Sequence, residues 1–107
     1  KQVSELKLTP DLLRQDAFIF EDGISSMLLE CDKADYHLKV SFPEFPAAAV
    51  WSMPSAIDKA EYICIEPWYG MNDFVGQGVQ DIRKKYLIQS LKAGETKEIS
   101  YTIEICD

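Results

Sequence analysis

The sequence predicts an all-β protein, an antiparallel β-sandwich of about seven short strands. Apolar residues recur either at every second position or in short solid runs, and turn-forming residues separate these runs. No apolar pattern of helical period continues far enough to predict a long helix. Aromatic residues make up 11% of the chain, and they pack well on pleated surfaces. With 107 residues, the chain is expected to form one domain at most.

The predicted elements follow one another at short intervals. Near the N-terminus, Thr9-Pro10-Asp11 is typical of a helix cap and first turn, so residues 11–14 are expected to form one turn of helix. Strands are predicted at residues 17–20, 25–31, 36–42, 47–53, 61–66, 86–91 and 98–105. A loop or helical turn is expected at 54–60, a long glycine-containing loop at 68–80 and a helical turn at 81–85.

The stretch 36–42 shows the clearest alternation. One face carries Tyr36, Leu38, Val40 and Phe42, and the other carries His37, Lys39 and Ser41. This pattern is typical of a strand with one face in water, so His37 is expected to be a solvated structural residue. The apolar run 47–53 predicts a strand buried on both faces, and Pro43 and Pro46 interrupt the ladder before it.

Charge limits the partners that the chain is expected to bind. Eleven Lys and Arg residues stand against 18 Asp and Glu residues, which gives a net charge of −7. Nucleic acids and anionic membranes repel such a chain, whereas a neutral sugar meets no such penalty. No apolar run reaches the length of a membrane span. A single histidine cannot build a histidine-rich metal site, and no cofactor is expected.

Three widely spaced cysteines, Cys31, Cys64 and Cys106, form no C-x-x-C pair. This odd count favours reduced thiols and a cytoplasmic location, and each cysteine is expected to be a small buried apolar residue. The sequence begins Lys1-Gln2-Val3, without an initiator Met or an apolar signal core, so it is expected to be a portion of a longer protein.

Candidate chemistry is concentrated in the segment 62–70, Tyr-Ile-Cys-Ile-Glu-Pro-Trp-Tyr-Gly. Alternation along a strand puts Glu66 on the face opposite the isoleucines. A carboxylate that ends an apolar strand is poorly hydrated, which suits a general base. Pro67 is expected to end the ladder and leave Trp68 and Tyr69 near the acid, where aromatic rings and a carboxylate suit a sugar. A structural interpretation stays open, in which Glu66 is an exposed strand-end acid and Trp68 a core aromatic.

Five motifs occur in order along the chain: Asp16-Ala17-Phe18-Ile19-Phe20; Phe42-Pro43-Glu44-Phe45-Pro46 with Val50-Trp51-Ser52; Ile63-Cys64-Ile65-Glu66-Pro67-Trp68-Tyr69-Gly70; Leu91-Lys92-Ala93-Gly94-Glu95; and Ser100-Tyr101-Thr102-Ile103-Glu104-Ile105. In order and spacing they resemble the aldose 1-epimerase (galactose mutarotase-like) family, in particular its bacterial LacX-like branch. The resemblance covers most of the chain from about Leu6 onward, and its last two motifs resemble the family's closing hairpin.

The resemblance implies that residues 1–107 are the C-terminal portion of a large β-sandwich enzyme that interconverts the α and β anomers of a hexose. Glu66 aligns with the family's base, which takes the proton from the anomeric hydroxyl, while a family histidine protonates the ring oxygen. That histidine and a sugar-binding arginine belong to an N-terminal portion that is not matched here, and His37 does not match it. Losing one acid–base partner typically costs about two to four orders of magnitude, so this chain alone is expected to have little or no activity.

Further site residues are candidates with alternatives. The resemblance implies that Asp16 contacts a sugar hydroxyl, and the alternative is a turn or strand-start acid. Trp51 is a candidate for sugar stacking, although core packing is the preferred interpretation. Asn72 and Asp73 either border the pocket or cap the loop. The glycines at 76–78 are not a phosphate loop, because the required Lys and long helix do not follow.

Three functions follow from these observations. The leading one is the catalytic portion of a mutarotase built around Glu66. The second is a carbohydrate-binding module that stacks sugars on Trp51, Trp68 and Tyr69, with Glu66 only accepting a hydrogen bond from a hydroxyl. The third is a structural sandwich without a ligand. Because a partial sandwich leaves strand edges and apolar faces open, self-association is expected in each case.

Overall fold

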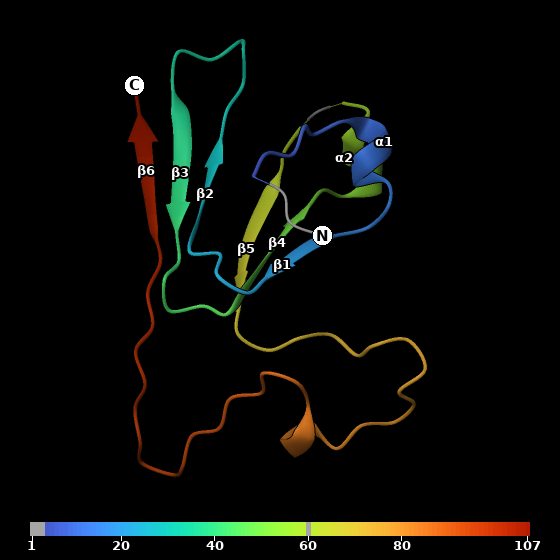
Figure 1. Cartoon of the computed structure of the whole chain (residues 1–107), viewed down its shortest axis with the longest axis vertical. Coiled ribbons are helices and arrows are strands. Elements are labelled where there is room, and N and C mark those ends of the chain that lie inside the picture. The colour runs from blue at the N-terminus through green and yellow to red at the C-terminus, as the bar shows by residue number, and fades with distance from the viewer. Residues whose placement is uncertain (1–3, 60) are drawn as a thin grey trace.

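The protein is mostly β, with two open, sandwich-like antiparallel sheets of three strands each. The computed structural model describes residues 4–59 and 61–107. Sheet A contains, in spatial order, β1 (Phe18–Glu21), β4 (Ala47–Trp51) and β5 (Cys64–Trp68). Sheet B contains β2 (Ser26–Leu29), β3 (His37–Ser41) and β6 (Thr102–Cys106). Figure 1 shows the two sheets side by side, with β6 on the outer side of sheet B.

Two single-turn helices lie together beside sheet A (Figure 1). The first, α1 (Pro10–Leu13), begins at Thr9, whose Oγ1 accepts a hydrogen bond from the Leu12 backbone N–H at 3.2 Å. The second, α2 (Pro54–Ile57), also begins with a proline. Proline is tolerated in the first turn of a helix because a backbone N–H there has no carbonyl partner within the helix. An ion pair between Arg14 and Asp58 joins the two helix ends. The helical turn predicted at 11–14 is therefore confirmed. Of the loop or helical turn expected at 54–60, the structure forms a helical turn, and residue 60 lies outside the described residues.

The core lies between the two sheets. One buried cluster consists of Leu13, Val50 and Ile57, and another consists of Val40, Phe42 and Ala48. Met27 of β2 packs against both clusters. Ala48 and Val50 of β4 thus face sheet B, and the residues that alternate with them lie on the opposite, outer face of sheet A. This assignment places the side chain of Glu66 on the outer face, because Glu66 is paired with Ala49.

The strands predicted before residue 60 agree with β1 to β4. The run at 47–53 forms the central strand β4, which is buried on both faces as expected. The predicted end of the next strand at Pro67 is wrong, because β5 continues through Pro67 to Trp68. β5 lies at the edge of its sheet, where a proline without an N–H is tolerated.

The second half of the chain departs further from prediction. The strand expected at 86–91 is absent from the described structure, and the one expected at 98–105 is reduced to β6. Only a tight turn remains of the closing hairpin: the Glu95 N–H donates to the Lys92 carbonyl at 3.0 Å. Strand propensity is insufficient where no partner strand lies alongside. The described chain therefore has six strands rather than about seven.

Residues 69–101 run outside both sheets, below them in Figure 1. Gly70 has a φ of 119°, a backbone conformation that side chains disfavour, and there the chain leaves β5. The helical turn expected at 81–85 is confirmed as a 3₁₀ turn, η1 (Ile82–Lys84), with Asp81 as its cap. The segment returns to sheet B where the Ser100 N–H donates to the Glu44 carboxylate at 2.8 Å.

Within residues 4–59 and 61–107, no helix has the length and apolar character needed to cross a membrane. The three cysteines are free thiols. The expectation that each is buried is wrong for Cys31, which is exposed next to a charged turn, whereas Cys64 and Cys106 are half-buried.

Candidate functional site

The outer face of sheet A brings Glu66 and Trp68 together. Both side chains project from the same face of β5, because they are two residues apart on a strand. The indole Nε1–H of Trp68 donates a hydrogen bond to Oε2 of Glu66 at 3.0 Å, and both residues are half-buried. This bond orients the carboxylate and satisfies one oxygen, so the other oxygen remains available to accept a hydrogen bond from a hydroxyl.

Small side chains lie beside this pair. In the sheet register, Ala49 is opposite Glu66 and Ala47 is opposite Trp68, and both alanines have no exposed surface. Trp51, half-buried and opposite Cys64, lies on the same face of the sheet. The face thus presents one carboxylate and two indole rings, which is a combination that can bind the hydroxyls and C–H surface of a sugar.

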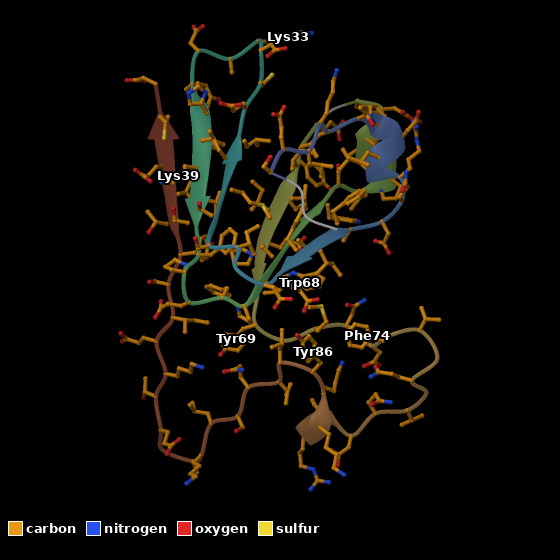
Figure 2. The ribbon with its side chains drawn as sticks, viewed as in Figure 1. Lys33, Lys39, Trp68, Tyr69, Phe74 and Tyr86 are labelled. Atoms are coloured by element: carbon orange, nitrogen blue, oxygen red, sulfur yellow. The ribbon has the colours of Figure 1, made fainter. Side chains whose placement is uncertain are left out.

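The other predicted sugar-binding residues lie elsewhere. Tyr69 follows β5 directly and is exposed (Figure 2). Nζ of Lys97 lies 4.6 Å from its ring centroid. Asp16 is exposed in the turn before β1 at a φ of 77°, and its Oδ1 accepts from the Ala17 N–H at 2.8 Å. This contact fits the alternative interpretation of Asp16 as a turn acid.

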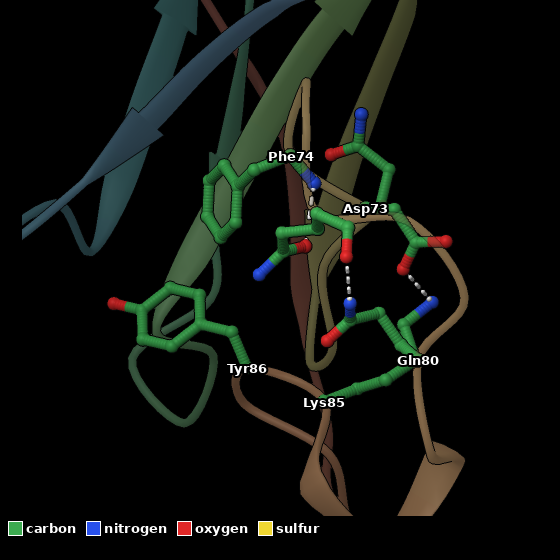
Figure 3. A pocket seen from close by; sticks show the side chains of 7 residues that line it. Asp73, Phe74, Gln80, Lys85 and Tyr86 are labelled. Atoms are coloured by element: carbon green, nitrogen blue, oxygen red, sulfur yellow. Dashed lines mark hydrogen bonds and ion pairs between the residues drawn. The ribbon is translucent and has the colours of Figure 1, made fainter.

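Asp73 also has a structural partner. Its Oδ1 lies 3.0 Å from Nζ of Lys85, within the loop that follows β5. A small hollow of about 10 Å³ is found there, room for about one water molecule. Its lining consists of Asn72, Asp73, Phe74, Gln77, Gln80, Lys85 and Tyr86 (Figure 3). Asn72 and Asp73 therefore border a hollow that is too small for a hexose.

A larger hollow of about 480 Å³ opens between the sheets next to the helices. Apolar residues from sheet B, from both helices and from the segment just before β5 line it, among them Leu13, Leu29, Leu38, Ile57 and Ile63. Neither this hollow nor the small one is lined by Glu66. Glu66 therefore lies on a sheet face beside an indole, outside both hollows.

Glu21 is a candidate that the sequence interpretation missed. It ends β1 opposite Ala47, so it lies on the same face as Glu66, two strands away. Its carboxylate is close to the hydroxyl of Tyr86, which contacts Phe74 at 5.9 Å between ring centroids. Figure 2 shows Tyr86 and Phe74 next to each other near the end of the sheet. Alternation along β1 predicts the face of Glu21, but no sequence signal links it to Tyr86.

Hydrogen bonding to the Glu21 carboxylate, together with the negative charges of Glu21 and Asp22 and some burial, raises the pKa of Tyr86 above its usual value. In the folded chain, Tyr86 is therefore expected to ionise at higher pH than an unperturbed tyrosine, as followed by NMR of ¹³C-labelled tyrosine. Because the pKa of Tyr86 is higher in the folded chain, its protonated form contributes to the free energy of unfolding. This contribution is fully present below the ordinary tyrosine pKa and is lost as pH rises through the pKa of Tyr86 in the folded chain. Glu21→Gln should lower the Tyr86 midpoint, and an equal midpoint in both proteins would contradict this contact.

The histidine of this chain does not lie on this face. The chain's single histidine, His37, is half-buried on β3 of the other sheet, on the face shared with Lys39 and Ser41, as predicted. Among the described residues, no group of three or more His, Cys, Asp or Glu side chains is placed to hold a metal ion.

Comparison of the chain with protein-family models, with curated proteins and with solved structures finds no match.

Proposed function

We propose that the outer face of sheet A is the glutamate side of an aldose 1-epimerase site, carried by the C-terminal portion of a galactose mutarotase-like β-sandwich. The observation that carries the proposal is the half-buried Glu66 carboxylate oriented by the Trp68 indole. The motif resemblance in five segments supports it independently, because the same glutamate aligns with the family's base. The substrate class is a neutral hexose, for which the net charge of −7 imposes no repulsion.

In the proposed reaction, Glu66 removes the proton from the anomeric hydroxyl of the bound sugar. As the C1–O bond to the ring oxygen breaks, an acid protonates that oxygen and the ring opens. Rotation about the C1–C2 bond and the reverse proton transfers close the ring with the other anomeric configuration. Because His37 lies on the other sheet, the acid is not supplied by this histidine, and the 107-residue chain alone is expected to bind sugar with little turnover.

The alternative is a carbohydrate-binding module without catalysis. The observation that favours it is the presence of two indoles, Trp51 and Trp68, on the face of Glu66. In such a module, Glu66 acts only as a hydroxyl acceptor. Both functions require a sugar at this face, and they differ in whether Glu66 transfers a proton.

Sugar binding is testable through Trp68. The chain has two tryptophans, so Trp51→Phe leaves Trp68 as the single indole fluorophore, hydrogen-bonded to Glu66. Titration with galactose or glucose is expected to change its emission saturably. Glu66→Gln in the Trp51→Phe background should raise the dissociation constant for the sugar roughly five-fold, because a charged hydrogen-bond acceptor is replaced by a neutral one.

A matched control is Glu104→Gln in the same background, since Glu104 is an exposed strand carboxylate on sheet B. This variant should bind sugar with unchanged affinity. Absence of any saturable response in the parent protein would exclude both sugar-based functions and leave a structural role.

A further inference from the structure

The chain exposes much more surface than a compact protein of its size. Its accessible area is 8575 Å², whereas a monomer of 12.2 kDa is expected to expose about 6,100 Å². Its radius of gyration is 16.1 Å, compared with about 13 Å for a compact domain of this length. The excess of roughly 2,500 Å² is as large as one subunit's share of an extensive obligate dimer interface, about 1,000–2,500 Å².

Part of this excess is apolar surface on β6. Ile103 is 59% exposed and Ile105 is 74% exposed. In the register of sheet B, Ile103 is opposite the buried Val40 and Ile105 is opposite Leu38, so both isoleucines lie on the core-facing side of the sheet. The core-facing side therefore extends beyond sheet A onto β6, where the described residues leave it largely uncovered.

The edge formed by β6 is also less protected than either edge of sheet A. Prolines and charges on an edge strand discourage pairing with another chain. β5 carries Pro67, and β1 ends in Glu21 with Tyr86 beside it. β6 contains neither proline nor lysine, and its single charged side chain, Glu104, points to the outer face of sheet B.

We propose that a second copy of this chain pairs antiparallel with β6, which joins the two B sheets into one six-stranded sheet across a two-fold axis. The favoured register has its axis at Ile103, so that Ile103 meets its own counterpart and Tyr101 meets Ile105 on the core-facing side. Thr102 then meets Glu104 on the other side. An axis at Glu104 is disfavoured, because two carboxylates would face each other. This inference concerns the 107-residue chain and uses no property of the proposed sugar site.

The oligomeric state tests the proposal directly. Light scattering after gel filtration is expected to give a mass near twice 12.2 kDa at micromolar concentration. Because each copy carries a net charge of −7, added salt should strengthen the dimer by screening repulsion. Ile103→Lys places two like charges together at the axis and should raise the dissociation constant at least about 100-fold.

Leu28→Lys is the matched control. Leu28 is 53% exposed and lies in sheet B as Ile103 does, but it is paired with Lys39 on the outer face. This variant should remain dimeric. A monomeric parent at all salt concentrations, or equal dissociation of both variants, would overturn the proposal.

Cross-linking tests the register without relying on weakened association. In a background with Cys31, Cys64 and Cys106 replaced by Ser, Ile103→Cys should form an intermolecular disulfide under mild oxidation. Directly opposite residues of an antiparallel pair have Cα atoms about 4.5–5.5 Å apart, which fits the disulfide range of about 4.4–6.8 Å. Leu28→Cys in that background should stay monomeric on a non-reducing gel. A dimer in solution that Ile103→Cys fails to cross-link would contradict the β6 register.

Discussion

Glu66→Gln is expected to slow α/β anomer exchange by about 10²–10⁴-fold in the product of the complete open reading frame. The amide of glutamine keeps the size of the side chain, and its oxygen can still accept the Trp68 indole hydrogen bond that is seen at 3.0 Å. It cannot take a proton from a hydroxyl near neutral pH. Polarimetry or exchange NMR with the separate anomers of galactose and glucose measures the rate.

Glu104→Gln serves as the control here as well, because it removes a strand carboxylate from the other sheet. Its exchange rate should equal that of the parent. If Glu66→Gln exchanged anomers at the parental rate while folded by circular dichroism, Glu66 would not be the base. Retained sugar binding in that variant would then support the binding module.

Phe42→Ala is expected to destabilise the fold by about 3–5 kcal/mol, a large part of the 5–15 kcal/mol typical of a small domain. Phe42 has no exposed surface and packs with Val40 and Ala48 where the two sheets meet. Truncation leaves a cavity that these neighbours cannot close, because both belong to hydrogen-bonded strands. Urea unfolding at a fixed protein concentration gives the free energy, since association would shift it.

Phe74→Ala is the control for this change. Phe74 is 49% exposed in the loop after β5, so its truncation should cost no more than about 1 kcal/mol. Similar losses for the two phenylalanines would mean that the junction of the sheets is not the main core.

The local pattern of apolar and polar residues was sufficient to predict a strand where at least one of its faces is buried within the chain. Alternation predicted β3, since Val40 packs into the core while Lys39 is exposed. The alanine-rich run predicted β4 because a central strand has no wet face. Alternation also predicted that Glu66 is separated from the inward-facing Ile65.

The sequence pattern was insufficient wherever a strand or a side-chain contact depends on residues that are distant in the chain. Tyr86 to Leu91 has strand-like composition, but no strand of the described chain lies beside it. The contact between Glu21 and Tyr86 joins residues 65 positions apart, and the order of strands within each sheet is likewise set by tertiary packing. The open face around Glu66 could not be predicted for the same reason, because a hollow depends on which segments pack above it.

The pairing of β6 with β3 has a consequence for the order of events during synthesis. Their paired residues are 61 to 69 positions apart, from Ser41 and Thr102 to His37 and Cys106, whereas those of β1 and β4 are 26 to 32 apart. Closing a longer loop costs more entropy, so sheet A is expected to assemble while the C-terminal residues are still inside the ribosome. During that interval β3 has a free edge, and this edge is the point at which a nascent chain is most open to chaperones or to mispairing with a neighbouring polypeptide.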